Sequence, residues 1–217
     1  MNPQIRHMYF FNAFPVGARG RRRRFQARLG QNYRMTLVNF GSGPRPLPGF
    51  VNVDLDPAGR PDVVADLSRG LPFADASVDA IFSEDCVAYL DVAELGGFLA
   101  ECRRILKRDG VMRILTPDLA RLARMYLEEP ARLVRFWTSA VHVPLPHGTA
   151  ADVVNLGMKL AGTWMYDEAT FRHLAASAGF DTAVVAYGDS RHPALRGIDL
   201  RKPGEAVSMY LECTPRA

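Results

Sequence analysis

Short apolar runs alternate with amphipathic segments along most of the chain, beginning at residue 36. Runs rich in apolar and β-branched residues predict strands at 36–40, 50–55, 62–67, 77–83, 111–117, 180–188 and 206–213. Strands that alternate with helices indicate an α/β fold with a mostly parallel sheet that is covered on both faces. No helical pattern separates the last two runs, so we expect those two strands to form an antiparallel pair.

Two segments carry clear helix signals. Asp91 is suited to cap the helix that follows it, and Glu94 completes a capping box three residues later. We expect the sequence KRDG, with Gly110 in a left-handed turn, to end that helix. Asp167 caps a second helix, which Gly179 ends. Both helices therefore connect strands, as the crossover helices of a parallel sheet do.

Residues 118–165 interrupt this alternation. Three helical segments follow one another there, and the proline loop PLPHG separates the second from the third. Because ligands of such sheets bind where strands end, we interpret the block as an insertion that covers a substrate. A plain packing layer of helices is the alternative that the sequence leaves open.

The net charge of +4 conceals an uneven distribution. Residues 1–34 contain eight arginines and neither Asp nor Glu, so they carry +8 and the rest of the chain carries −4. We therefore expect a basic N-terminal arm at 1–35 and one domain at 36–217. A hydrophobic composition of 48% is enough for that domain to bury a sizeable core.

No sequence signal directs the chain to a membrane or to secretion. No apolar run approaches the roughly 20 residues that cross a bilayer, and the first residues lack the order of a signal peptide. Cys86, Cys102 and Cys213 are odd in number and far apart, with no disulfide or metal spacing. We expect a cytoplasmic protein with no metal site.

A glycine-rich turn follows the first predicted strand, in FGSGPRPLPGF. Gly41 and Gly43 let the backbone come close to a ligand. A dinucleotide fingerprint would need a third glycine at Pro46 and a helix that faces the pyrophosphate. Pro46 and Pro48 would each cost about 3 kcal/mol inside such a helix. The turn therefore suits a ligand without phosphates.

Two acidic residues end the next two predicted strands. Asp54 is placed to accept hydrogen bonds from the hydroxyls of a ribose. Asp66 is placed to accept one from an adenine amino group. Together with the two glycines, this set recognises an adenosine that carries no phosphate. S-adenosylmethionine is such a ligand, since its amino-acid end needs only backbone groups and a few polar contacts.

Four segments in the same order resemble one family. They are VNFGSGPRPLPGFVNVDLD, ADLSRGLPFADASVDAIFS, ECRRILKRDGVMRILTPDL and GTWMYDEATFRHLAASAGF. The chain, over about 36–213, is similar to class I S-adenosylmethionine-dependent methyltransferases, in a branch like methyltransferase type 11. The resemblance implies a Rossmann-like seven-stranded sheet whose last strand is antiparallel.

The resemblance also implies which residues bind the cofactor. The glycine turn would lie against the methionine end, Asp54 would hold the ribose, and Asp66 with Leu67 would hold the adenine. Residues at the end of the fourth strand would lie beside the sulfonium and the substrate. The full set of expected cofactor-binding residues is Phe40, Gly41, Ser42, Gly43, Asp54, Leu55, Asp66, Leu67, Ser83 and Glu84.

One segment departs from the family. Relatives often carry a histidine-rich segment after the fourth strand, where this chain has DCVAYL, with Asp85 and Tyr89 at the expected histidine positions. Catalysis therefore needs other candidates. A base is needed only if the acceptor must lose a proton. The candidates for a base or acceptor ligand are Asp85, His142, His147 and His192, and Tyr89 and Arg191 are candidates for substrate binding.

Three hypotheses follow for function. The first is S-adenosylmethionine-dependent methyl transfer to a small-molecule or glycan-type acceptor. In the second, the methyl acceptor is RNA or another polyanion, and Arg19–Arg28 contacts nucleic acid or an anionic surface. The third, motivated by DCVAYL, is a protein that binds the cofactor without transferring methyl groups. The sequence does not fix the oligomeric state.

Overall fold

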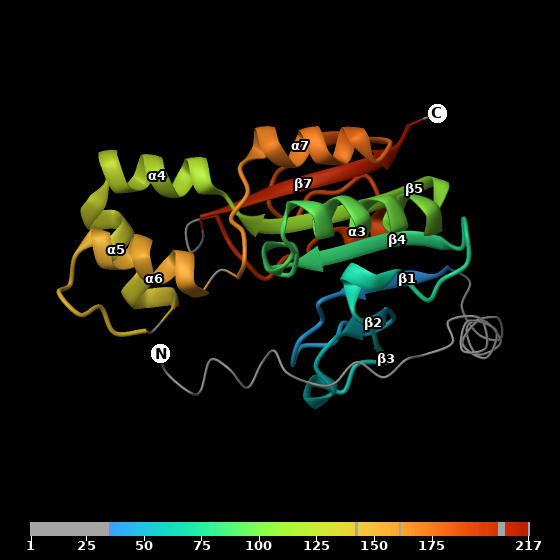
Figure 1. Cartoon of the computed structure of the whole chain (residues 1–217), viewed down its shortest axis with the longest axis horizontal. Helices are drawn as coiled ribbons and strands as arrows, with labels where there is room; N and C mark the ends of the chain where they lie inside the picture. The colour runs from blue at the N-terminus through green and yellow to red at the C-terminus, as the bar shows by residue number, and fades with distance from the viewer. Residues whose placement is uncertain (1–34, 142, 161, 204–206, 217) are drawn as a thin grey trace.

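The computed structural model describes residues 35–141, 143–160, 162–203 and 207–216. It contains a seven-stranded sheet with the strand order β3-β2-β1-β4-β5-β7-β6 (Figure 1). The strands are β1 (Leu37–Phe40), β2 (Val51–Asp54), β3 (Val63–Val64), β4 (Val78–Glu84), β5 (Leu106–Pro117), β6 (Phe180–Val184) and β7 (Ser208–Pro215). The first five run parallel, and β7 is antiparallel to both of its neighbours. This confirms the predicted Rossmann-like fold with an antiparallel last strand.

Two helices cover one face of the sheet, α3 (Val92–Ile105) and α7 (Glu168–Ser177) (Figure 1). The capping box predicted for α3 is present, because Asp91 accepts the Glu94 amide and Glu94 accepts the Asp91 amide. The main core lies between these helices and the sheet, where Phe40 packs edge-on against Phe73 and Phe98. Because Phe40 is the last residue of β1, this packing fixes the position of the carboxyl end of β1.

The opposite face is covered by loops over the described residues, and the proline loop is one of them. The proline loop lies where a helix could have been, and Asn52 on β2 fixes its position. The Asn52 side chain accepts a hydrogen bond from the Leu47 amide and donates to the carbonyls of Leu47 and Phe50. Asn39 on β1 donates a further hydrogen bond to Asn52. Since one buried amide side chain satisfies the loop backbone, the three prolines are accommodated without a helix.

A second loop, residues 186–201, crosses the same face and is called the strap. Arg113 on β5 is fully buried, and its guanidinium forms an ion pair with Asp199 and donates to the carbonyls of Ala186 and Asp189. Glu212 on β7 accepts hydrogen bonds from the Ser190 hydroxyl and the strap backbone. The strap contains one 3₁₀ turn, η4 (Pro193–Leu195). A second apolar core lies beneath it.

Three further helices follow β5: α4 (Leu119–Glu128), α5 (Pro130–Ala140) and α6 (Ala150–Leu160). They lie together beyond the carboxyl ends of β4 and β5 (Figure 1). Their apolar side chains form a third core with Met165, separate from the two cores of the sheet; it includes Leu122, Leu133, Trp137 and Val153. The three helices therefore lie beside the strand ends, where a segment that covers a bound acceptor is expected.

Some predicted boundaries were wrong. β5 begins at Leu106, so α3 ends directly in a strand and Gly110 lies inside that strand, outside the left-handed region. The run 62–67 forms only two strand residues before the 3₁₀ turn η2 (Leu67–Arg69). The basic arm and His142 lie outside the described residues. Among the described helices, none has the length and apolar character needed to cross a membrane.

Candidate functional site

The carboxyl ends of β1, β2 and β4 meet at one edge of the sheet. Phe40 pairs with Val53 on one side and with Ser83 on the other, so these three strands end at the same level. Gly41 continues from β1 with φ +72° and donates its amide to the Val53 carbonyl. A Cβ added at Gly41 would overlap the side chain of Cys86, which packs against it. Only glycine fits at this position, because both the backbone angle and the contact exclude a side chain.

Gly43 and Asp54 are joined directly. The Gly43 amide donates to Asp54 Oδ2 at 2.7 Å, and the Asp56 amide donates to Oδ1 at 2.8 Å. A Cβ added at Gly43 would meet no atom within 4 Å, so open space lies over this glycine. The carboxylate at the end of β2 is therefore held next to an open part of the glycine turn.

The remaining residues of this turn differ in what they can offer a ligand. The Ser42 hydroxyl is buried and has no hydrogen-bond partner among the described residues. Leu55 is largely exposed, whereas the Phe40 ring lies in the main core, so Phe40 can contribute only its backbone. Gly59, in the 3₁₀ turn η1 (Pro57–Gly59), packs so closely on the Gly43 carbonyl that a Cβ there would overlap it.

Asp66 and Leu67 lie one strand farther along the same edge. Asp66 caps η2, since its Oδ1 accepts hydrogen bonds from the Ser68 amide and hydroxyl, and its Oδ2 pairs with Arg69 at 3.0 Å. Leu67 is buried in the main core. The Asp66 carboxylate therefore already has local partners, which fix its position after β3.

These residues fit an adenosine ligand that lacks phosphates. Residues 41–50, all of which the structure describes, form turns without a helix, so no helix N-terminus is present there for a pyrophosphate. The unpartnered Ser42 hydroxyl, the open space over Gly43 and the fixed Asp54 carboxylate are compatible with such a ligand. The donor set therefore agrees with that cofactor.

The end of β4 carries three polar residues with different surroundings. Ser83 is fully buried beside the Cys86 thiol, and burial raises the pKa of Cys86 to about 12. Glu84 directs its carboxylate to the end of the strap, where it accepts the amides of Leu200 and Arg201. Burial raises the pKa of Glu84, and the two amides oppose that shift. Glu84 therefore holds the strap rather than pointing freely at a ligand.

Asp85 forms an ion pair with Arg201, with Nη2 and Oδ2 separated by 2.6 Å. Asp85 has φ +54°, an angle that non-glycine residues rarely adopt and that tends to occur at functional sites. Burial raises its pKa, whereas the Arg201 charge lowers it. Tyr89 lies close by, since burial and the Asp85 charge both raise its pKa. Arg201 was not predicted, because nothing local in GIDLRKPG indicates a partner 116 residues away.

A segment that follows the third helix of the block packs on the turn after β4. The amides of Thr163 and Trp164 both donate to the Ala88 carbonyl, and Gly162 packs so closely on that carbonyl that a Cβ would overlap it. Trp164 is about half exposed. Asp85, Tyr89, Trp164 and Arg201 are together called the mouth. They come from three segments distant in sequence, which the Asp85–Arg201 ion pair and the hydrogen bonds to Ala88 bring together.

The other predicted residues do not join the mouth. His147 is exposed at the start of α6, where its ring pairs with Asp152; this hydrogen bond is the main reason that the Asp152 pKa is lowered to about 2. His192 begins η4 on the strap, and its Nδ1 is buried without a partner among the described residues. Arg191 approaches Glu212 in the middle of β7. Asp85 is therefore the catalytic candidate that the structure places at the strand ends.

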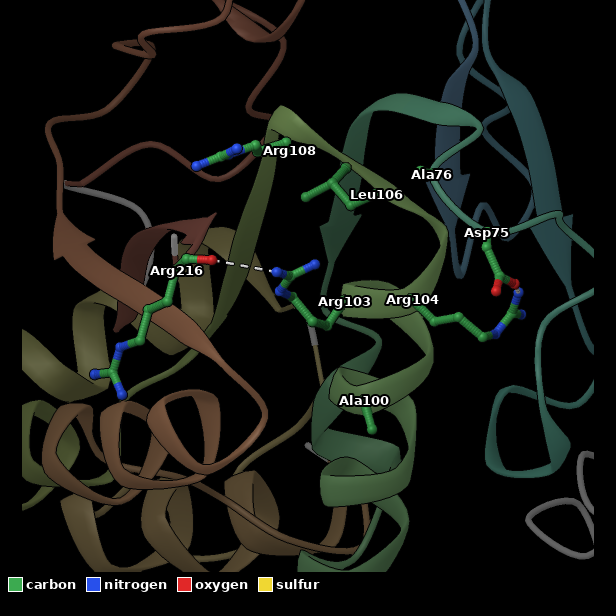
Figure 2. Close-up of a pocket in the computed structure, with 8 residues that line it drawn as sticks. All are labelled: Asp75, Ala76, Ala100, Arg103, Arg104, Leu106, Arg108 and Arg216. Atoms are coloured by element: carbon green, nitrogen blue, oxygen red, sulfur yellow. Dashed lines mark hydrogen bonds and ion pairs between the residues drawn. The ribbon is translucent and has the colours of Figure 1, made fainter.

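A hollow of about 650 Å³ lies at the opposite edge of the sheet (Figure 2). It is lined by residues that precede β4, end α3, begin β5 and follow β7, including Arg103, Arg104 and Arg108. It belongs to the amino edge of the parallel strands, and so is distinct from the glycine turn. Within the described residues, no group of three or more His, Cys, Asp or Glu side chains could hold a metal ion.

A comparison with protein families matches part of this region. Residues 48–114 match the family model described as methyltransferase domain. No curated protein matches the chain. The matched residues include Asp54, Asp66, Glu84 and Asp85, so they contain most of the edge described above.

Solved structures share the fold at low sequence identity. The PH0226 protein from Pyrococcus horikoshii OT3 is 15% identical, with a TM-score of 0.51, and the alignment covers 98% of this chain and 99% of that one. A SAM-dependent methyltransferase from Thermotoga maritima is 18% identical, with a TM-score of 0.51, over 87% of this chain and 86% of that one. These similarities are evidence of a common architecture.

Proposed function

We propose that this chain, a class I methyltransferase that uses S-adenosylmethionine, methylates a small-molecule or glycan-type acceptor bound at the mouth. The observation that carries the proposal is the position of the Asp85–Arg201 ion pair. It stands one residue from the end of β4 and one residue from Cys86, which packs on Gly41. The proposed acceptor site therefore adjoins the proposed donor site.

On the donor side, the glycine turn and the ends of β2 and β3 would hold the cofactor. Asp54 would receive the ribose hydroxyls with the lone pairs that the Gly43 and Asp56 amides leave free. Ser42 offers a hydroxyl, and Leu55 offers an exposed apolar surface to a base. The bound cofactor supplies a methyl group already activated by its sulfonium charge, so positioning of the acceptor contributes much of the rate.

On the acceptor side, the mouth favours a compact ligand. The segment 162–164 is held by hydrogen bonds to Ala88, and Leu200 and Arg201 are held by Glu84. Trp164, which is half-exposed, and Tyr89, which is about one-third exposed, supply flat apolar surfaces, while Asp85 and Arg201 supply a few charged groups. Such a combination is typical of sites that bind small ligands, and it also suits a sugar ring, whose two faces are apolar and whose rim carries hydroxyls.

Asp85 is the group that would orient or deprotonate an acceptor hydroxyl. Its carboxylate is partly buried, which raises its pKa, and the nearby Arg201 charge opposes that shift. A carboxylate held this way can accept a hydrogen bond from the acceptor and take its proton as the methyl group is transferred. Asp85 also stands at one of the two positions where the related branch is expected to carry a histidine.

The experiment is a transfer assay with tritium-labelled S-adenosylmethionine. The full chain is incubated with neutral sugars, uronic acids and phenols, and in parallel with single-stranded RNA, after calorimetry has measured binding of the cofactor and of its demethylated product. We expect both cofactor forms to bind, and tritium to appear in a low-mass acceptor. Asp85→Asn is expected to lower kcat by about 100-fold, within the range typical of a lost general base, and to leave cofactor affinity unchanged.

Asp75→Asn is the matched control, since Asp75 is an exposed carboxylate at the opposite edge. It should transfer at the wild-type rate. Incorporation into RNA alone would replace the small-molecule proposal with the polyanion alternative. Cofactor binding without any transfer would support the non-transferring alternative, and failure to bind either cofactor form would contradict the donor site itself.

A further inference from the structure

Arg201 lies at an exposed end of the strap. Leu200 is half exposed, and residues 201–203 are exposed as well. A long side chain on such a loop has many rotamers, and holding it in one ion pair costs conformational entropy. The Asp85–Arg201 pair is therefore well defined only if other residues fix the backbone from which the arginine extends.

Two side chains of the sheet hold the peptide groups on either side of Arg201. Glu84 on β4 accepts the Arg201 amide at 2.8 Å and the Leu200 amide at 3.1 Å. Tyr210 on β7 donates its hydroxyl to the Arg201 carbonyl. Because the amide and the carbonyl of Arg201 are both bound, the direction in which its side chain leaves the loop is fixed.

Glu84 and Tyr210 belong to one row of residues across the sheet. Glu84 pairs with Leu115 on β5, and Leu115 pairs with Tyr210. Paired residues point to the same face, and Leu115 and Tyr210 both lie in the core beneath the strap. The strand spacing puts the Cα atoms of Glu84 and Tyr210 about 10 Å apart. The Leu115 carbonyl also accepts the Asp85 amide, so this row holds both members of the ion pair.

The surroundings of Tyr210 make it a rigid support. Its ring is buried and meets the Tyr187 ring edge-on, with the ring centroids 6.0 Å apart. The Tyr187 hydroxyl in turn donates to the Asp199 carbonyl. Burial raises the pKa of Tyr210 to about 12, so its hydroxyl remains a hydrogen-bond donor throughout the neutral pH range. The ring is thus fixed by packing, and the hydroxyl is the group that contacts Arg201.

We propose that Tyr210, together with Glu84, is a positioning residue for methyl transfer, because it holds the Arg201 guanidinium against Asp85. The inference rests on the proposed role of Asp85 at the mouth. Tyr210 acts through Arg201 and needs no contact with the acceptor. Loss of its hydroxyl would release the Arg201 carbonyl and let the guanidinium move away from the carboxylate. Asp85 would then be less well placed to receive an acceptor hydroxyl.

The titration of Asp85 reports the position of Arg201 without any need for activity. The titratable groups around this carboxyl come from its own segment and from the strap; they are Glu84, Cys86, Tyr89 and Arg201. Burial raises the pKa of Asp85, and the Arg201 charge lowers it. A guanidinium that leaves the pair no longer opposes the effect of burial, so Asp85 should then titrate at higher pH.

The first measurement is an NMR titration of the full chain, isotopically labelled at the aspartate carboxyl carbons, with Asp85→Asn to assign the signal. Tyr210→Phe removes the hydroxyl and keeps the ring. We expect Asp85 to titrate at higher pH in Tyr210→Phe than in the wild type, and also in Arg201→Met. The double variant Arg201→Met/Tyr210→Phe should titrate like Arg201→Met alone, because Tyr210 acts through Arg201.

The second measurement is kinetic, in the tritium transfer assay. Tyr210→Phe should lower kcat at neutral pH by about 5- to 10-fold, the effect of one neutral hydrogen bond, and leave the KM for S-adenosylmethionine unchanged. The acidic limb of its pH–rate profile should move to higher pH together with the NMR titration. Ser77→Ala is the matched control, since it removes a hydroxyl that donates to the Ala74 carbonyl just before β4, and it should match the wild type.

An Asp85 titration that rises in Arg201→Met but not in Tyr210→Phe would overturn the positioning role. So would equal effects in Ser77→Ala, additive effects in the double variant, or a wild-type kcat in Tyr210→Phe when Asp85→Asn has lost activity. Failure of the proposed function has a different result, in which Asp85→Asn keeps the wild-type kcat or no low-mass acceptor is methylated. The NMR titration then still decides whether Tyr210 positions Arg201. Thermal unfolding of each variant checks that it is folded.

Discussion

Two glycines of one turn have opposite surroundings, and this difference separates their roles. Both have positive φ, +72° at Gly41 and +51° at Gly43. The space over Gly41 is filled by Cys86, whereas the space over Gly43 is open. Gly41 therefore serves the packing of β1 against η3 (Val87–Tyr89), and Gly43 leaves room for the proposed cofactor.

Replacing each glycine by alanine tests this assignment. Gly41→Ala should lower the free energy of unfolding by about 3 kcal/mol, because backbone strain and overpacking against Cys86 act together. Gly43→Ala should lower it by about 1 kcal/mol, from strain alone, while weakening cofactor binding more than its stability cost suggests. Urea denaturation and calorimetry measure the two quantities. Equal losses of stability would contradict the overlap with Cys86.

Asp54 offers a second test at the level of one residue. Asp54→Asn replaces a charged acceptor of two amides with a neutral side chain that keeps only one oxygen. Charge-assisted hydrogen bonds contribute about 1.5–3 kcal/mol, so S-adenosylmethionine should bind about 10- to 100-fold more weakly by calorimetry. Asp56→Asn, which changes only the cap of η1, is the control and should bind normally.

At the scale of elements, loops replace helices on the second face of the sheet because buried polar side chains satisfy their backbones. Asn52 does this for the proline loop, and Arg113 does it for the strap. Both side chains lie on strands in the interior of the sheet, so each loop is fixed to a rigid element. The strap in turn carries Arg201 to Asp85, which ties the packing of one loop to the geometry of the mouth.

The buried pair Arg113–Asp199 should be intolerant of the loss of one partner. Asp199→Asn leaves the Arg113 charge uncompensated and should cost about 3–5 kcal/mol of unfolding free energy, measured in urea. The double variant Arg113→Met/Asp199→Leu removes both charges and should be more stable than the single variant. A double variant no better than Asp199→Asn would show that the carbonyl contacts, rather than the charges, carry the cost.

At the scale of the whole molecule, the order of helices and strands along the chain could be predicted from the sequence. The contacts of the strap could not. The succession of strands and helices along the chain follows from local apolar runs and from two helix signals, of which the Asp91–Glu94 box is present as predicted. The early start of β5 was missed, because its first residues pair with β4 and no local pattern encodes that pairing. Arg201 and Asp199 were missed because their partners lie on distant strands and each looks like an ordinary loop charge.

The buried acidic end of β4 affects the stability of the whole chain as a function of pH. The pKa of Glu84 is raised in the folded state, so its contribution to stability is full below the unfolded value of about 4.5 and is lost as the pH rises through the folded value. Glu84→Gln removes this loss. Its unfolding free energy should therefore fall less than that of the wild type between pH 4.5 and pH 7.

Urea denaturation at a series of pH values measures this difference. Asp85, whose pKa is also raised by burial, remains in the variant. The variant should therefore keep part of the dependence of unfolding free energy on pH. Asp109→Asn, which removes an exposed carboxylate at the other edge, should retain the wild-type slope. Identical slopes for Glu84→Gln and the wild type would contradict the assignment.

The separate core of α4, α5 and α6 has a consequence for how such a protein can diversify. Leu122, Leu133, Trp137 and Val153 pack among themselves, apart from the residues that pack beneath the glycine turn. Mutations that reshape the cover are therefore largely independent of those that maintain the donor site. We therefore expect a chimera that carries the corresponding block of another such chain to keep its affinity for S-adenosylmethionine, measured by calorimetry, while its acceptor changes.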